Sequence, residues 1–292
     1  RREFLATVAA GVSATASGLP ALAADAARPK RLAVVTTEWR YYSHAWHMAE
    51  RFLNGYPVKG RWHRPPIEVV SAYVDQKPAK DLSSDRAQEF GFTIYPTIAE
   101  ALRCGGKQLA VDAVLQIGEH GDYPNNELGQ KKYPRYEFFK QVTDVFRADG
   151  RSVPVFNDKH LSWNWEWAKY MWRTIQEMKI PYMAGSSLPF AKYHPFVPLP
   201  KGQKLDHVIA IGYGGFESYG FHSIETGQFV VDKREGGEKG VKWVQFYSGK
   251  AGWEAYQAGG FPKDIAEAAF SKTWKPNGKP TDFTHEVFAY DI

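Results

Sequence analysis

The chain has 292 residues, a hydrophobic content of 43% and a formal net charge of +5. That content is ordinary for a globular protein, and the length is enough for one large domain or two of ordinary size. The basic residues are scattered, with no run of five or six, so the charge pattern of a nucleic-acid-binding protein is missing and we expect no nucleic-acid partner. The single cysteine, Cys104, cannot form an internal disulfide. We expect it to be a small buried residue near the end of a helix.

The first residues follow the order of features found in a secretion signal. Arg1 and Arg2 precede an aromatic residue and a leucine, and a weakly apolar run covers residues 6–19. Small residues at 21–23 then offer a cleavage site. The run is too short and too polar to span a bilayer of about 30 Å. We interpret residues 1–24 as a cleaved twin-arginine signal peptide, which predicts an exported, periplasmic or extracytoplasmic protein with the twin-arginine translocation machinery as a partner.

Strand-like and helix-like segments alternate over residues 31–185. The expected strands cover 31–37, 67–74, 111–117, 153–156 and 181–185, and the expected helices cover 43–53, 83–90, 97–104, 133–148 and 162–178. A loop rich in Pro, Gly and basic residues is expected at 56–66. Short apolar strands that alternate with helices are typical of a parallel sheet with helices on both faces. We therefore predict an α/β fold with a Rossmann-like domain over residues 30–190.

Polar side chains follow the predicted strands, at the edge where parallel sheets bind their ligands. They are Glu38, Arg40, Ser43 and His44 after the first strand, Asp75 and Lys77 after the second, Glu119, His120 and Asp122 after the third, and Asp158, Lys159 and His160 after the fourth. Polar residues are common at strand ends in general. So many acidic and imidazole groups at one edge nevertheless favour a functional site there.

Several motifs in this order resemble one known family of enzymes. The segments DRAQEFG at 85–91, YPTIAEAL at 95–102 and VDAV at 111–114 are similar to motifs of the glucose–fructose oxidoreductase and inositol dehydrogenase family (Gfo/Idh/MocA). In that family a later strand carries Glu-Lys-Pro, and VFNDKH at 155–160 takes its place here. Lys159 therefore matches the family lysine, which lies beside the nicotinamide and the substrate.

A second family motif, Asp-x-Gly-x-His-x-x-Asp, resembles the segment at 218–225. His222 takes the position of the histidine that acts as acid and base, and Glu225 takes that of the last acid. Ser218 replaces the first Asp, which supports the histidine in the family, and the neighbouring Glu217 is a candidate substitute. We expect Lys159 and His222 to face each other across one cleft.

The resemblance implies an oxidoreductase that moves a hydride between NAD or NADP and a hydroxyl group of a sugar or polyol. His222 would be the base, and Lys159 would orient the substrate oxygen. The residues expected to bind the cofactor are Asp75, Arg40, Ser43 and Glu119, and Lys77 would tolerate a 2′-phosphate. The residues expected to bind the carbohydrate-like small molecule are His120, Asp122, Asp158, His160 and Glu225. The resemblance leaves a homo-oligomer open.

The turn after the first strand departs from the family pattern. Family members carry a glycine-rich turn there, which lets the backbone approach the pyrophosphate. Residues 36–43, TTEWRYYS, contain no glycine, and Glu38 stands where a phosphate would need room. The resemblance is therefore to an exported member with a divergent nucleotide-binding loop.

Residues 191–292 resemble the start of the family's second, α+β domain. The segment 205–211 begins it, and the family's domain continues into an open, mostly antiparallel sheet. The chain stops in strand-like sequence at 284–290, so we expect the second domain to be incomplete.

Two alternatives to the oxidoreductase stay open. Glu119, His120, Asp122, Asp158, His160 and His44 could gather a divalent metal for hydrolase or isomerase chemistry on the same scaffold. The chain could also be a non-catalytic sugar-binding protein that has lost its cofactor. The missing glycines favour these two alternatives, whereas the matches at Lys159 and His222 favour the oxidoreductase.

Overall fold

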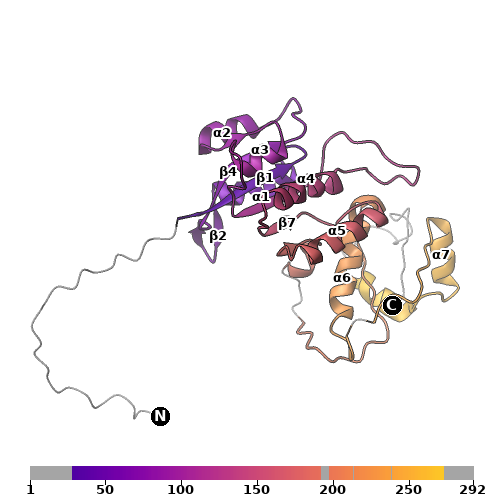
Figure 1. The fold of residues 1–292 in the computed structure, drawn as a ribbon. Helices are drawn as coiled ribbons and strands as arrows, with labels where there is room; N and C mark the ends of the chain where they lie inside the picture. Colours follow the sequence, from indigo (N-terminus) through magenta and orange to yellow (C-terminus); the bar gives the residue numbers. More distant parts are fainter. Residues whose placement is uncertain (1–27, 192–196, 213, 238, 273–292) are drawn as a thin grey trace, which may run out of the picture.

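The computed structural model describes residues 28–191, 197–212, 214–237 and 239–272 (Figure 1). In chain order the first part contains β1 (Lys30–Thr36), α1 (His44–Leu53), β2 (Tyr56–Val58), β3 (Arg61–His63), β4 (Ile67–Val74), α2 (Ser83–Phe90), β5 (Thr93–Ile94), α3 (Ile98–Arg103), β6 (Ala113–Ile117), α4 (Arg135–Ala148), β7 (Val155–Asn157), α5 (Trp165–Glu177) and β8 (Tyr182–Met183). After β8 come the 3-10 helix η1 (Leu188–Phe190), the π-helix η2 (Phe216–Gly220), α6 (Phe221–Val231), α7 (Lys250–Gln257) and α8 (Lys263–Lys272). No helix in the described ranges is long and apolar enough to span a bilayer.

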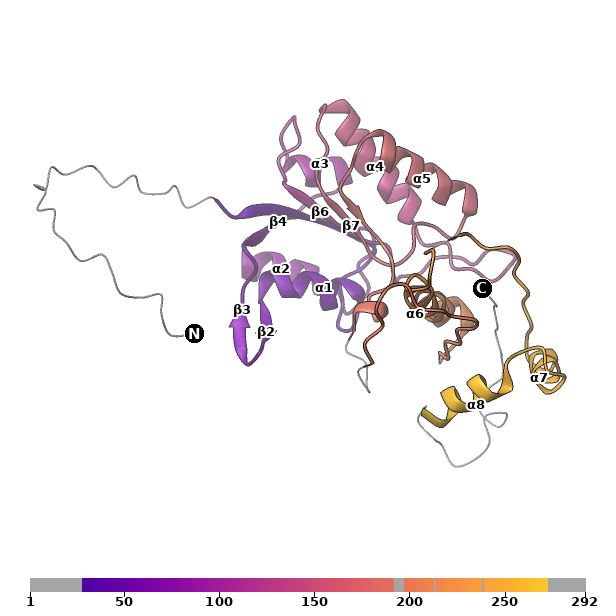
Figure 2. The same ribbon diagram turned by 90° about the horizontal axis from the view of Figure 1, so that it is seen from below.

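The main sheet has six strands in the order β5-β4-β1-β6-β7-β8, and every neighbouring pair is parallel. Figure 2 shows α3, α4 and α5 on one face of this sheet and α1 and α2 on the other. The predicted Rossmann-like parallel sheet with helices on both faces is therefore confirmed. All the strands end at the same edge, and α6 lies beyond that edge (Figure 2).

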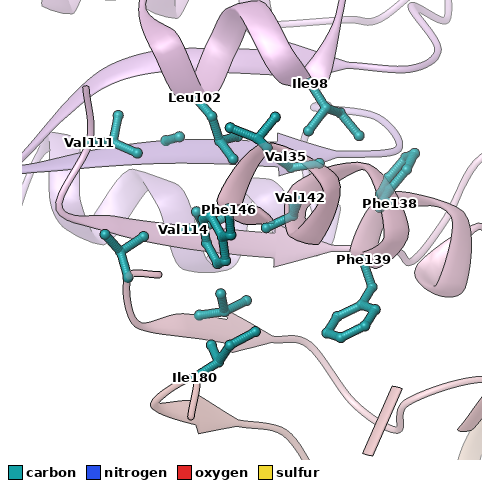
Figure 3. Packing of buried hydrophobic residues seen from close by; sticks show 14 of the residues in the cluster. Val35, Ile98, Leu102, Val111, Val114, Phe138, Phe139, Val142, Phe146 and Ile180 are labelled. Carbon is teal, nitrogen blue, oxygen red and sulfur yellow. The ribbon is translucent and has the colours of Figure 1, made fainter. Parts of the chain in front are cut away.

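Successive side chains of β1 point into the two halves of the core, because side chains alternate between the faces of a strand. Ala33 and Val35 pack with residues of α3, α4 and α5, including Leu102, Phe146 and Met171 (Figure 3). Leu32 and Val34 pack on the opposite face with α1 and with partly buried residues of α2. The stretch from Leu32 to Val35 is buried on both faces of the sheet, which explains why it is apolar at every position.

Side-chain caps begin three of the described helices, namely α1, α3 and α5. Ser43 Oγ accepts the Trp46 N–H at 3.3 Å at the start of α1, and Thr97 Oγ1 accepts the Glu100 N–H at 3.1 Å at the start of α3. This second contact is the threonine half of a capping box, in which Glu100 is the third residue of the helix. At the other end of α3, Cys104 takes a left-handed conformation with φ 49° and is half-buried. The expectation of a buried cysteine is met only in part, because this residue caps the helix, where it packs against the core but stays partly exposed.

The structure corrects two segments. Residues 56–66, expected to be a loop, contain the antiparallel hairpin of β2 and β3, whose turn has Lys59 and Gly60 at φ 48° and 76°. Two positive φ values in succession suit the twist of a two-residue hairpin. Residues 205–211, expected to begin the second domain, have no regular structure, and the regular elements described after β8 are all helical. The signal peptide at 1–24 and the strand-like sequence at 284–290 lie outside the described residues.

Candidate active site at the carboxyl edge of the sheet

Lys159 and His222 meet at the carboxyl edge of the sheet. Lys159 follows β7, and His222 lies in the first turn of α6. Lys159 Nζ lies 3.0 Å from His222 Nε2, although the two residues are 63 positions apart. The prediction that they face each other is confirmed. Their roles in a reaction stay a prediction.

The contacts of His222 define which ring nitrogen carries the proton. A lysine ammonium can only donate, so Nε2 must accept from Lys159 and Nδ1 must carry the hydrogen. Nδ1 lies 2.6 Å from Ser186 Oγ, to which it donates. Burial lowers the pKa of His222, and the charge of Lys159 lowers it further. His222 is therefore a neutral imidazole whose Nε2 points at a cation, the arrangement required of a base.

The backbone of Lys159 is strained. Its φ is 64°, in the left-handed region that costs a residue with a side chain about 1–2 kcal/mol. The Gly185 N–H donates to the Lys159 carbonyl at 2.7 Å and holds this conformation. Such strain tends to persist where a side chain must be aimed, and here it accompanies the contact between Lys159 and His222.

Glu119 connects this pair to the body of the sheet. One carboxylate oxygen of Glu119 lies 3.7 Å from Lys159 Nζ, and the other accepts from Arg135, the first residue of α4. Arg135 is 1% exposed, so its charge is paired inside the protein. Glu119 thus lies between two cationic side chains, those of Lys159 and Arg135.

A cavity of about 290 Å³ opens beside these groups. This volume lies near the lower end of the range for small-molecule sites, roughly 300–1,000 Å³. Its lining includes Glu119, Lys131, Tyr133, Arg135, Lys159, His160, Glu217, Ser218 and Phe221. The cavity is therefore polar and suits a small hydroxylated molecule better than an apolar one.

Three more imidazoles lie near the same edge. His44 Nδ1 lies 2.5 Å from Asp158 Oδ2, and the ring of His120 contacts that of His44 edge-on with centroids 4.8 Å apart. Burial lowers the pKa of His120 to about 4. Burial, together with the nearby Arg135, lowers the pKa of His160 to about 3. His120 and His160 are therefore neutral near pH 7 and can bind a hydroxylated molecule as donors or acceptors.

Other expected site residues have different surroundings. Asp75 accepts hydrogen bonds from the hydroxyl groups of Tyr73 and Tyr123, both at 2.6 Å. Asp122 is exposed, and its backbone pairs with the side chain of Gln76. Lys77 is exposed as well. These residues lie at the edge of the sheet, but no described contact links them to Lys159 or His222.

The residue that supports His222 differs from the one expected. Glu217 accepts the Lys131 N–H at 2.9 Å, and Ser186 occupies Nδ1 of His222 instead. The proposed substitution of Glu217 for the family aspartate is therefore wrong in this structure. Ser186 escaped the sequence analysis because it follows a two-residue strand, β8, and its contact partner lies 36 positions away.

The turn between β1 and α1 does not fit a dinucleotide bound by its pyrophosphate. Trp39 is fully buried there and stacks on Phe92 with centroids 5.7 Å apart. Glu38 is 4% exposed and lies 2.6 Å from Arg40 Nε. A buried carboxylate and a buried indole leave no room for phosphate oxygens, and the carboxylate repels them.

Several backbone donors of this turn are also engaged. The N–H groups of Thr37 and Ser43 donate to the carbonyls of Ile117 and Arg40, and the Arg40 N–H donates to Ser43 Oγ. A phosphate at a helix N-terminus needs such donors free. Arg40 and Ser43, expected to bind the cofactor, stabilise the turn itself, which corrects that expectation.

The described residues do not form a metal site. No three His, Cys, Asp or Glu side chains among them converge as ligands. Of the residues named for that alternative, His44 pairs with Asp158, Glu119 pairs with Arg135, and Asp122 is exposed. The geometry therefore does not support a metal-dependent hydrolase or isomerase.

Comparison with known proteins gives similarity of fold. No protein-family model matches the chain, and no curated protein matches it. A myo-inositol 2-dehydrogenase from Lactobacillus plantarum shares 15% identity and a TM-score of 0.36 over 56% of this chain and 38% of its own. A biliverdin reductase from Synechocystis sp. PCC 6803, in complex with biliverdin and NADP+, shares 13% identity and a TM-score of 0.34 over 53% of this chain and 37% of its own.

A third structure, GenD2 from gentamicin A biosynthesis in complex with NAD, shares 16% identity and a TM-score of 0.43 over 70% of this chain and 55% of its own. The chain thus spans less than two thirds of each of these proteins. Each similarity concerns the fold alone.

Proposed function

We propose that the chain is an exported oxidoreductase of the Gfo/Idh/MocA type that acts on a hydroxyl group of a sugar or polyol. One observation carries this proposal. At the carboxyl edge of a parallel sheet, a lysine lines a polar cavity, and a neutral histidine lies 3.0 Å from that lysine. They are also the two residues that the family resemblance selects from the sequence.

The pair is suited to removing a proton from a hydroxyl group. A substrate oxygen in the cavity would take the place of the direct contact between Lys159 and His222. His222 Nε2 would accept the hydroxyl proton, and Lys159 Nζ would donate to the same oxygen and stabilise the developing negative charge. Glu119, held by Arg135, would help to orient the Lys159 side chain for this task.

The resemblance implies NAD or NADP as the group that would accept the hydride from the substrate carbon. The turn between β1 and α1 does not fit the usual binding of a dinucleotide through its pyrophosphate. Binding measurements with NAD and with NADP decide between the two.

The turn between β1 and α1, which is filled by its own side chains, favours a second candidate, a sugar-binding protein without a cofactor. In such a protein Lys159, His222 and the neutral His160 would bind hydroxyl groups without moving a hydride. The cavity and its polar lining serve both candidates equally, whereas the buried Trp39 and Glu38 suit only the second.

The molecule that the native protein carries distinguishes these candidates. The protein is purified under native conditions and denatured, and the released small molecules are examined by ultraviolet absorption and mass. The oxidoreductase predicts a nicotinamide dinucleotide in near-stoichiometric amount, or saturable binding of added NAD or NADP by calorimetry. If neither is found, while sugars or polyols bind without turnover, the second candidate replaces the first.

Export is the part of this proposal that depends on residues 1–24. Replacing Arg1 and Arg2 with Lys should leave the precursor in the cytoplasm, because the twin-arginine pathway reads the arginine pair. The matched control is Arg28→Lys, which makes the same change beyond the signal. Cell fractionation measures the result, and normal export of the double variant would contradict the assignment.

A further inference from the structure

Gly185 and Ser186, which follow β8, contact both members of the pair. The Gly185 N–H donates to the Lys159 carbonyl at 2.7 Å, and Ser186 Oγ accepts from His222 Nδ1 at 2.6 Å. The Ser186 N–H also points at Glu225 Oε2, 3.4 Å away on the same helix as His222. Two adjacent residues therefore fix the backbone of the lysine and the side chain of the histidine.

The hydroxyl of Ser186 is itself held in place. Ser186 is 5% exposed, and its Oγ also accepts the Leu188 N–H at 3.1 Å. Two N–H groups thus converge on the two lone pairs of this oxygen. The hydroxyl cannot turn away from His222 without leaving a buried donor unpaired, which costs about 1–3 kcal/mol.

We propose that Ser186 is a positioning residue of His222: its hydroxyl oxygen accepts the Nδ1 hydrogen, and together with the Lys159 ammonium, which donates to Nε2, it holds the ring in one tautomer and one orientation. The inference rests on the proposed function for its meaning in catalysis. Its geometric part, the fixed tautomer, can be tested without any substrate.

A hydroxyl in this position differs chemically from a carboxylate. A carboxylate beside Nδ1 would stabilise the imidazolium and strengthen the base, whereas a neutral hydroxyl does neither. The charged and titratable groups that act on His222 are Lys159 and Asp158 at the end of β7 and His44 on α1. Lys159 and His44 disfavour the imidazolium, and Asp158 favours it. With Ser186 as partner, His222 stays neutral over a wide range of pH.

Nitrogen NMR of the imidazole rings tests the inference, because the shifts of Nδ1 and Nε2 report which one carries hydrogen. The signal of His222 is assigned with His222→Gln. The wild-type protein should show the Nδ1–H tautomer, and Ser186→Ala should lose it in favour of a mixture or of Nε2–H. Ser186→Asp should raise the pKa of His222 by about 1 to 3. The control is Ser187→Ala, which changes the adjacent, exposed serine and should leave the His222 signal unaltered.

Ser186→Thr keeps the hydroxyl and should retain the wild-type tautomer, which separates the role of the oxygen from a packing effect. If Ser186→Ala keeps the Nδ1–H tautomer of the wild type, the inference is overturned. Thermal unfolding confirms that each variant is folded. Where turnover is found, Ser186→Ala should lower kcat by about 10–100-fold with little change in KM, because Ser186 does not line the cavity. A fixed tautomer in a protein that binds no dinucleotide would leave this inference intact and overturn the proposed function alone.

Discussion

Lys159 combines a strained backbone with a partly buried charge, and both serve its contact with His222. Lys159→Met should lower turnover by roughly 10²–10⁴, because the developing negative charge on the substrate oxygen would lose its cation. The same change should raise the pKa of His222, since the charge of Lys159 lowers it in the wild type. Steady-state kinetics and an NMR titration of His222 measure the two effects.

Lys179→Met is the matched control for this change. Lys179 also has a left-handed backbone, with φ 50°, but its side chain is exposed and lies in the turn after α5. It should leave both turnover and the His222 titration unchanged. A wild-type pKa of His222 in Lys159→Met would contradict the electrostatic role given to the lysine.

At the scale of elements, the caps allow a clean test of local stability. Thr97 is exposed, and its hydroxyl caps α3, so Thr97→Ala removes the capping bond with little loss of packing. The free energy of unfolding should fall by about 1 kcal/mol. Thr97→Ser keeps the hydroxyl and should stay close to wild type. Urea denaturation measures both, and equal losses in the two variants would show that the cap is not the cause.

Much of the sheet could be predicted from the sequence because β1, β4 and β6 are buried. Burial on both faces favours the largely apolar runs that the sequence analysis used, although β4 and β6 also bury the polar side chains of Ser71 and Gln116. The hairpin of β2 and β3 could not be predicted this way, since its strands are three residues long and largely exposed. Residues 205–211 are apolar enough for a strand but do not form one. A strand needs a neighbouring strand to pair with, and the described elements after β8 are helices, which provide none.

The site could be predicted only in part. Lys159 and His222 belong to motifs that the resemblance identifies, and the sheet topology brings the first to its edge. Ser186 and Arg135 belong to no such motif, and their importance comes from contacts between distant residues. Periodicity in a sequence indicates on which face of a helix or strand a residue lies, but it does not indicate which distant residue that side chain contacts.

At the scale of the whole molecule, two neutral histidines make stability depend on pH. The pKa of His120 is about 4 and that of His160 is about 3 in the folded state, against about 6.5 in an unfolded chain. Between pH 6.5 and these values the unfolded chain binds more protons, so the free energy of unfolding falls as the pH falls. Each histidine contributes up to about 1.4 kcal/mol per pH unit within that window.

Urea denaturation of the wild type and of His160→Gln at pH 7 and pH 5 tests this dependence. The wild type should lose up to about 2 kcal/mol more than the variant between the two values. His63→Gln, which changes an exposed residue of β3, should lose as much as the wild type. Equal losses in the wild type and His160→Gln would show that His160 is not held neutral by burial.

The turn between β1 and α1 has a consequence for how such a chain can change over generations. The side chain of Trp39 is fully buried. Replacing it with a small side chain would lower the free energy of unfolding by about 3–5 kcal/mol, out of a total of about 5–15 kcal/mol. Removing Glu38 would leave Arg40 without its ion-pair partner, and introducing glycines would loosen the turn. Several substitutions would be needed to convert this turn into a phosphate-binding one. Among them, substitution of Trp39 by itself would lower the free energy of unfolding most. Conversion of this turn into a glycine-rich one by single substitutions is therefore opposed by selection for folding, so we expect the present turn to persist.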